Sequence, residues 1–160
     1  MQSQLQVDTL YDADFYAWTQ QQAEYLRSGK VSALDFENLA EEIESLGKQQ
    51  RQELRSRLGI LLGYLLKWHY QPQKRSSSWF YTILEQRSEI LKHLQENPSL
   101  KPYLPKAIIE GYEKGLYLFG RETGIHYRKL PQSCPFSDEQ IFEEPIDFPE
   151  PPSQRSSQTC

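Results

Sequence analysis

The stretch "LDFENLAEEIESLGKQQRQELRSRLGILLGYLLKWHY", residues 34–70, decides the fold. Its apolar side chains recur every three or four residues, which is the period of an α-helix. The residues that follow this period are Phe36, Leu39, Ile43, Leu46, Leu54, Leu58, Leu61, Leu65 and Trp68. The pattern continues across Gly47, and a glycine inside a helix costs only about 1 kcal/mol relative to alanine. We therefore predict one long helix over residues 33–69, which the sequence leaves free to bend at Gly47.

Both ends of this helix carry sequence signals. Ser32 and Asp35 resemble a capping box, in which side chains hydrogen-bond the free N–H groups of the first turn. Pro72 enforces the other end, because a proline disfavours the helical conformation of the residue before it. These signals predict a helix that begins near Ser32 and stops at about residue 69.

Shorter helices are expected on both sides, over residues 12–27, 77–97 and 105–124 and directly after residue 137. The first is bounded by Asp12 and Gly29, the second by Ser76 or Ser77 and Asn97, and the third by Pro105 and Gly124. Ser137 precedes the last. The first three should each bury one apolar stripe: Phe15, Trp18, Thr19, Ala23 and Leu26; Phe80, Ile83, Leu84, Leu91 and Leu94; and Ile108, Ile109, Tyr112, Leu116 and Phe119.

The predicted fold class is all-α, because no segment shows the sustained two-residue alternation of a half-buried strand. We predict a helical bundle of four main helices with a long second helix and a short C-terminal helix. The expected organisation is a flexible N-terminus at residues 1–10, a single helical domain at 11–143 and a proline-rich disordered tail at 144–160. Four of the ten prolines lie in that tail.

Charge is distributed unevenly along the chain, although the net charge is only −4. Residues 1–47 hold nine acidic and two basic residues, whereas residues 48–80 hold one acidic and seven basic residues. One interpretation is complementary pairing inside the bundle, and the other is a basic surface for an anionic partner. We favour pairing, because nucleic-acid-binding domains usually carry a net positive charge.

The acidic residues in "LDFENLAEEIESLG" allow three hypotheses, the last of which is an acidic docking surface. Glu37, Glu41 and Glu44 share one flank of the predicted helix, beside its apolar face. The first hypothesis is a solvated helix flank. The second is half of a divalent-metal site, since hard cations bind several carboxylate oxygens. Glu122 is then the best donor from another helix.

Several short motifs occur together in a fixed order. They are "YDADFYAW", "LDFENLAEEIESLG", "LLKWHYQP", "SSSW", Glu122-Thr123 and Cys134-Pro135. With them the chain resembles the domain-of-unknown-function family 29, a family of small bacterial proteins, over Tyr11–Phe148. The resemblance implies an all-helical cytoplasmic protein. It implies no substrate, cofactor or catalytic residue.

Two basic stretches are candidate sites. In "KWHYQPQKRSSSW" the side chains of Lys74, Arg75, Ser76 and Ser77 lie at the start of a predicted helix, where free N–H groups and cations can hold an anion. The alternative is an ordinary loop with a serine cap. "RETGIH", residues 121–126, has the Arg-x4-His spacing of toxin-type helical ribonucleases, but nine arginines and three histidines produce such spacings by chance.

The composition favours a cytoplasmic protein that is not membrane-bound. "GILLGYLL", residues 59–66, is far shorter than the roughly 20 residues of a membrane span. Two cysteines do not make a disulfide framework, and we expect Cys134 to pack in a loop rather than act as a nucleophile.

We predict a small interaction or ligand-binding module rather than an enzyme, with a protein or an anionic ligand as partner. No motif implies a cofactor, and the oligomeric state is left open. The first alternative is a metal-dependent hydrolase that acts on a nucleotide or phosphoester through the four glutamates. The second is a nucleic-acid binder or helical ribonuclease that uses Arg51, Arg55, Lys74, Arg75, Arg121 and His126. Nucleic acid is not the expected partner.

Overall fold

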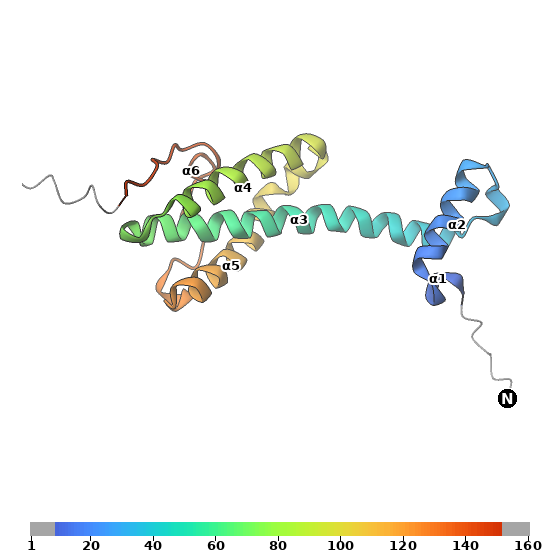
Figure 1. The fold of residues 1–160 in the computed structure, drawn as a ribbon, viewed down its shortest axis with the longest axis horizontal. Coiled ribbons are helices and arrows are strands. Elements are labelled where there is room, and N and C mark those ends of the chain that lie inside the picture. The colour runs from blue at the N-terminus through green and yellow to red at the C-terminus, as the bar shows by residue number, and fades with distance from the viewer. Residues whose placement is uncertain (1–8, 152–160) are drawn as a thin grey trace, which may run out of the picture. The chain divides into compact units, whose positions relative to one another are not determined.

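Every regular element in the part of the chain that the computed structural model describes, residues 9–151, is helical. The α-helices are α1 (Leu10–Ala13), α2 (Phe15–Arg27), α3 (Phe36–Tyr70), α4 (Ser77–Glu96), α5 (Leu104–Thr123) and α6 (Asp138–Phe142) (Figure 1). The 3-10 turns between them are η1 (Val31–Ala33), η2 (Pro72–Lys74), η3 (Pro98–Tyr103) and η4 (Tyr127–Lys129). This confirms the predicted all-α class, with four longer helices, a long spine and a short C-terminal helix. None of the helices in residues 9–151 is long and apolar enough to span a membrane.

The described residues form two compact units, unit 1 up to Gln49 and unit 2 from Gln50 onward. Helix α3 contributes its first turns to unit 1 and the remainder to unit 2. The residues predicted as one domain, 11–143, are therefore distributed between two units. Most of the predicted flexible and disordered ends, residues 1–8 and 152–160, lie outside the described residues.

The first predicted helix is in fact two helices, separated at Asp14. This residue has a non-helical backbone conformation, and its carboxylate accepts a hydrogen bond of 3.0 Å from the N–H of Ala17. Asp14 therefore caps α2, and the prediction that Asp12 caps a single helix is wrong. Asp side chains compete with the helical ladder for backbone N–H groups, which explains the break.

The start of α3 also differs from the predicted capping box. Ser32 lies in η1, and the helix begins at Phe36. The carboxylate of Asp35 accepts hydrogen bonds from the side-chain amide of Asn38 at 2.8 Å and from the indole N–H of Trp18 at 3.1 Å. The hydrogen bond of Asn38 holds the pKa of Asp35 below its usual value. Asp35 thus connects α2 to the first turn of α3.

Helix α3 runs through Gly47 without interruption. A methyl group added at this glycine would meet no other atom within 4 Å. No packing contact requires a glycine there. The backbone hydrogen bonds of the helix are enough to keep residue 47 helical.

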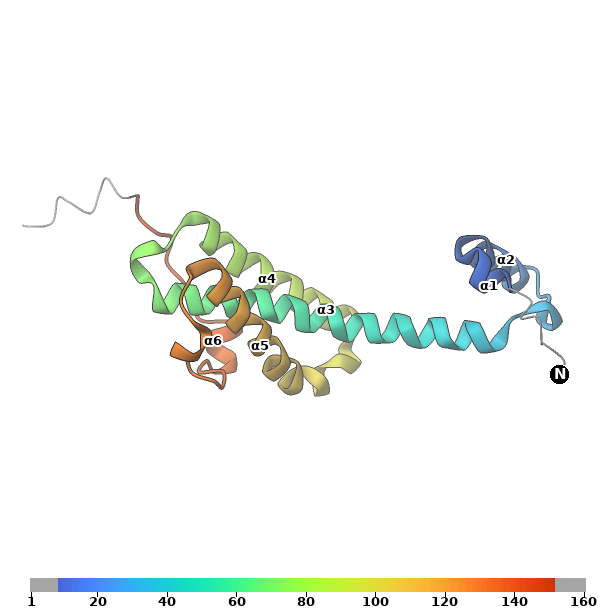
Figure 2. The same cartoon turned by 90° about the horizontal axis from the view of Figure 1, so that it is seen from below.

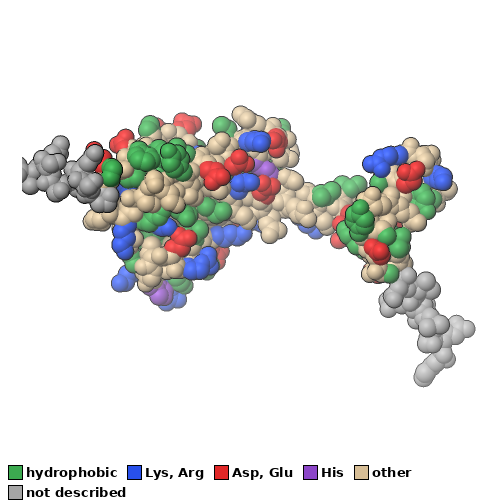
Figure 3. Space-filling view, in the orientation of Figure 1, with side chains coloured by type: hydrophobic (Ala, Val, Ile, Leu, Met, Phe, Trp, Pro, Cys, Tyr) green, Lys and Arg blue, Asp and Glu red, His purple; other side chains and the backbone are tan. Residues whose placement is uncertain are grey.

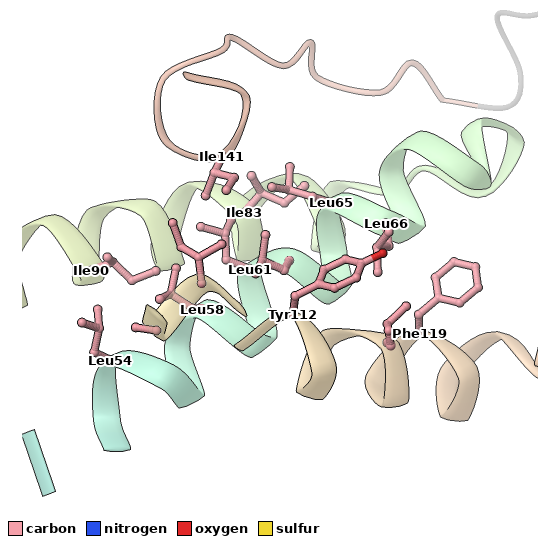
Figure 4. Close-up of a cluster of buried hydrophobic side chains, with 14 of the residues drawn as sticks. Leu54, Leu58, Leu61, Leu65, Leu66, Ile83, Ile90, Tyr112, Phe119 and Ile141 are labelled. Carbon is pink, nitrogen blue, oxygen red and sulfur yellow. The ribbon is translucent and has the colours of Figure 1, made fainter. Parts of the chain in front are cut away.

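The core of unit 2 surrounds the second half of α3. Leu61, Leu62, Leu65 and Leu66 are all completely buried, and Gly63, Lys67 and Trp68 are buried as well, so little of this part of α3 is exposed. Helices α4 and α5 both run beside it in two perpendicular views (Figures 1 and 2). The close-up of the core shows side chains from α3, α4, α5 and α6 meeting in one cluster (Figure 4).

Helices α3 and α5 approach each other through glycines. A methyl group placed on Gly115 would lie 2.9 Å from the backbone nitrogen of Gly63, and one placed on Gly111 would lie 2.8 Å from Cβ of Leu58. Methyl groups on Gly59 and Gly63 would likewise lie within 3 Å of side chains on α5. The two helices therefore pack backbone against backbone, which leaves no room for larger residues.

Part of each predicted apolar stripe is exposed. Phe15 and Leu26 of α2, Leu84 and Leu91 of α4, and Ile109 of α5 all have exposed side chains. Helix α4 instead buries two polar residues, Gln86 and His93, on the same face as Ile83 and Ile90. His93 is tolerated there because Nε2 of its ring lies 2.9 Å from the backbone oxygen of Gln50. The buried face of α4 therefore includes Gln86, Ile90 and His93 as well as Ile83 and Leu94 of the predicted stripe.

The predicted caps of the later helices are confirmed. Ser76 caps α4 and accepts a hydrogen bond from the N–H of Trp79. Gly124 ends α5 with φ of 73°, in the left-handed conformation that favours glycine. Ser137 and Gln140 form a capping box at α6.

Arg87 of α4 attaches α6 to unit 2. Its guanidinium donates hydrogen bonds of 2.7–2.9 Å to the backbone oxygens of Gln140, Ile141 and Glu144. Beyond α6, within the predicted tail, Phe148 packs edge-to-face on Phe80 at 5.2 Å between ring centroids.

We expect the substitution Gly115→Ala to lower the free energy of unfolding by at least about 2 kcal/mol, because its methyl group meets backbone that cannot move without separating α3 from α5. Gly47→Ala is the matched control on α3. It should raise the free energy of unfolding by about 0.5–1 kcal/mol, since alanine is the better helix former and its methyl group is unobstructed. Urea denaturation followed by circular dichroism measures both. Equal effects of the two substitutions would contradict the proposed packing.

Candidate functional site

The predicted anion site between α3 and α4 is largely occupied by the protein's own hydrogen bonds. Nε of Arg75 donates to the backbone oxygen of Trp68 at 2.8 Å, and its guanidinium lies 4.7 Å from the centroid of that indole ring. Ser76 is the helix cap, while Lys74 and Ser77 have exposed side chains. Arg75 therefore stabilises the end of α3, and anion binding by this loop stays a prediction.

The four glutamates of the predicted metal site do not share one environment. Glu37, Glu41 and Glu44 are exposed on the first turns of α3 in unit 1, whereas Glu122 belongs to α5 in unit 2. Among residues 9–151 no group of three or more His, Cys, Asp or Glu side chains is placed to hold a metal ion. Metal binding by these residues stays a prediction.

Glu122 instead forms an ion pair with Lys67 of α3. The ammonium group of Lys67 also lies 4.2 Å from the ring centroid of Tyr64 and 4.4 Å from that of Trp79, and the residue is only 5 % exposed. Two aromatic faces and one carboxylate therefore stabilise a charge that burial alone would disfavour. Sequence reasoning missed this group, although a lysine directly between the apolar Leu66 and Trp68 was a usable signal.

Arg51 and Arg55 are two of the candidate residues for nucleic-acid binding. Both contact Tyr103 at the end of η3. The guanidinium of Arg51 lies 4.9 Å from the ring centroid, and Arg55 donates to the phenolic oxygen at 3.0 Å and to Glu110 at 3.3 Å. The hydrogen bond from Tyr103 is the main cause that lowers the pKa of Glu110. These arginines hold η3 and α5 to α3.

Arg121 and His126 line the same surface hollow, although Gly124 ends the helix between them. The hollow has a volume of about 340 Å³, and Tyr117 and Tyr127 form part of its wall. The structure thus brings together the two ends of "RETGIH". A catalytic role of Arg121 and His126 stays a prediction.

Cys134 is half-buried in the loop before α6, as expected for a packed loop residue. Burial is the main cause that raises the pKa of its thiol. The thiol also donates a weak hydrogen bond to the backbone oxygen of Phe136. A raised pKa lowers the fraction of reactive thiolate at neutral pH.

An uncovered apolar surface lies on the first half of α3. We call it the α3 stripe; its residues are Phe36, Leu39, Ile43 and Leu46. Phe36, Ile43 and Leu46 are 62 %, 67 % and 57 % exposed. The four side chains fall within an arc of roughly 80°, because successive residues turn by 100°. Hydrophobic side chains are visible on this part of α3 in the space-filling view (Figure 3).

The α3 stripe is held in a defined unit. Trp18 of α2 is 3 % exposed and bonded to Asp35, and the side-chain oxygen of Gln22 accepts the N–H of Asp35 at 2.8 Å. The hydroxyl of Tyr11 in α1 donates to Glu42 of α3, which raises the pKa of Tyr11 to about 12. These contacts attach α1 and α2 to α3 and leave the stripe open.

Residues 10–146 match the family described as Domain of unknown function DUF29. The chain belongs to the DUF29 family. This confirms the resemblance seen in the ordered sequence motifs. No curated protein and no solved structure matches the chain. The matched residues of this DUF29 chain include the α3 stripe, the Lys67–Glu122 pair and the hollow at the end of α5.

The sequence identifies the residues of the α3 stripe as apolar positions of the long helix but does not predict their exposure. The helical period shows that Phe36, Ile43 and Leu46 share a face with Leu54, Leu58 and Leu61, but it does not show which of them another helix covers. In this DUF29 chain the distinguishing signal is charge: five of the fourteen residues at 34–47 are acidic, whereas "GILLGYLL" has no charged residue.

We expect Glu122→Gln to lower the free energy of unfolding by about 1–3 kcal/mol, because it leaves the buried ammonium of Lys67 without its counter-charge. Glu113→Gln, also on α5, is the control; its partner Tyr117 is exposed, and little change is expected. Thermal denaturation followed by circular dichroism separates the two. If the two variants melt alike, Glu122 does not stabilise Lys67.

Cys134 should react slowly with iodoacetamide at pH 8, at least about threefold more slowly than a free cysteine, because its raised pKa and burial leave less accessible thiolate. The measurement uses the Cys160→Ser variant, so that one thiol is followed by mass spectrometry. Unfolding in urea should restore the ordinary rate. Rapid alkylation of the folded protein would argue against the packed environment of this thiol.

Proposed function

We propose that this chain is a bacterial, cytoplasmic interaction module without catalytic activity, and that its α3 stripe binds a basic amphipathic helix of another protein. The observation that carries the proposal is the exposure of Phe36, Ile43 and Leu46 on a single helix face. Contiguous apolar surface with a polar border is typical of protein-binding sites. An amphipathic helix binds such a surface through side chains at the same helical spacing.

The charge around the α3 stripe supports a basic partner. Glu42 lies about 40° round the helix from Leu46 at one edge of the stripe, and Glu44 lies about 80° from Phe36 at its other edge, while Glu37 and Glu41 lie farther round the helix. Three of the four are exposed, while Glu42 accepts the hydrogen bond from Tyr11. Lysines and arginines that flank the apolar face of a partner helix would meet these carboxylates.

The same charges disfavour a second copy of the chain as the occupant. Pairing of two α3 stripes would bring the acidic edges of both copies, Glu42 and Glu44, toward each other, and like charges across an interface oppose binding. Phe15, Leu26 and Val31 of α2 and η1, also in unit 1, are exposed as well. A heterologous helix with basic flanks therefore fits unit 1 better than self-association does.

Two synthetic peptides of about five helical turns test the proposal. Both present leucines on one face; one carries lysines and arginines on the other faces, and the second carries glutamates. We expect the basic peptide to bind at least about tenfold more tightly, as measured by fluorescence anisotropy, because only it complements the carboxylates beside the stripe.

Ile43→Ser should weaken binding of the basic peptide at least about tenfold, since a buried isoleucine contributes roughly 1.5–3 kcal/mol. Ile109→Ser is the matched control, because Ile109 is 71 % exposed on α5 in unit 2. Both variants should retain the wild-type circular dichroism spectrum. Equal binding of the two peptides, unchanged binding by Ile43→Ser, or a dimer in sedimentation that Ile43→Ser dissociates would each overturn the proposal.

A further inference from the structure

The hollow at the end of α5 is formed by the chain reversing direction. Gly124 adopts a left-handed conformation, and the chain then folds back over the last turn of α5. The return is close: a methyl group on Gly120 would lie 3.3 Å from the backbone oxygen of Ile125. The side-chain oxygen of Thr123 fixes the turn by accepting the N–H of Ile125 at 3.1 Å. The hollow is thus part of the folded structure of unit 2.

Aromatic rings line one side of this hollow. Tyr117 is 48 % exposed and packs edge-to-face on Tyr127, with ring centroids 5.5 Å apart. The imidazole of His126 stacks on Tyr127 at 4.8 Å and an interplanar angle of 23°. Exposed, mutually packed rings of this kind offer a platform on which a planar ligand can stack.

The charge around the hollow is basic. Arg121 and His126 line it, Arg128 lies 5.9 Å from the ring centroid of Tyr127, and Lys129 follows. Lys and Arg side chains gather around the end of α5 in the space-filling view (Figure 3). Within the described part of the chain, no carboxylate lines this hollow, and Arg121 forms no ion pair.

Two acidic residues of α5 lie close to the hollow, and each has a partner within the protein; Glu113 itself lines a neighbouring hollow. Glu122, next to Arg121 in the sequence, pairs with Lys67, and Glu113 accepts the hydroxyl of Tyr117 at 3.2 Å. The carbonyl end of α5 disfavours anions, but two of its oxygens already accept hydrogen bonds from Gly124 and Thr123. The guanidinium of Arg121 is therefore available for an external anion.

A second hollow of about 290 Å³ adjoins the first and shares Leu116, Tyr117 and Tyr127 with it. The first hollow alone is large enough for a small ligand, and the pair gives separate places for a charged group and a ring. Arginine suits a phosphate, because its planar guanidinium can donate two parallel hydrogen bonds.

We propose that the hollow at the end of α5 binds a phosphate group attached to a planar base, with Arg121 at the phosphate and Tyr117 beside the base. This ligand chemistry is supplied either by a free nucleotide or by single-stranded nucleic acid. The proposal concerns a different unit from the α3 stripe and does not depend on it.

Isothermal titration calorimetry of the full chain with AMP, with a short single-stranded RNA and with inorganic phosphate tests the proposal. We expect AMP or the RNA to bind, with an affinity that falls as salt is raised. Tighter binding of the RNA identifies a strand as the source, and binding of AMP alone identifies a free nucleotide. Arg121→Gln should weaken binding at least about tenfold, because it removes a charge-assisted contact.

Two further variants make the test specific. Tyr117→Leu should weaken the binding of AMP or RNA without changing that of phosphate, since only the stacking surface is lost. Lys92→Gln removes one exposed charge from α4, outside the hollow, and should bind like the wild type. The proposal is overturned if neither AMP nor RNA binds, if phosphate binds as tightly as AMP, or if a folded Arg121→Gln variant binds as the wild type does.

Discussion

The close contact between α3 and α5 is the constraint on which unit 2 depends. Gly59 and Gly63 on α3 meet Gly111 and Gly115 on α5, and added methyl groups there would lie 2.8–2.9 Å from neighbouring atoms. This contact brings the two backbones together, so leucines on the remaining faces of α3 reach α4 and α6 as well as α5. The close approach of the two helices also places Lys67 of α3 where it forms an ion pair with Glu122 of α5.

The two halves of α3 have different roles, although one periodic pattern runs through both. In unit 2 the helix is surrounded, and its leucines are fully buried. In unit 1 the α3 stripe is exposed and bordered by carboxylates. Polar side chains organise the connections in both units: Asp35 joins α2 to α3, and Arg87 joins α4 to α6. The chain therefore combines one closed core with one open apolar face.

Helical periodicity and caps predicted much of the fold, because they depend on residues near one another in sequence. Ser76, Gly124 and Ser137 are where those rules place them. Burial depends on distant residues, so periodicity alone could not show that Ile43 and Ile109 are exposed while His93 is buried. Gly59 and Gly63 of α3 are four residues apart, and so are Gly111 and Gly115 of α5. This spacing in the sequence indicates a close helix pair. At the end of α5, the sequence showed Arg121 and His126 at a suggestive spacing, but only the return of the chain at Gly124 places them in one hollow.

Hydrogen exchange along α3 tests this account most directly, because one helix contains both the packed and the open segment. We predict that amides at residues 54–66 exchange only through global unfolding, like those at 108–119 of α5. Amides at residues 40–49 should exchange much faster, through local opening of a helix that lacks a covering partner. Equally slow exchange over residues 40–49 and 54–66 would contradict the division of α3 into a buried half and an open half.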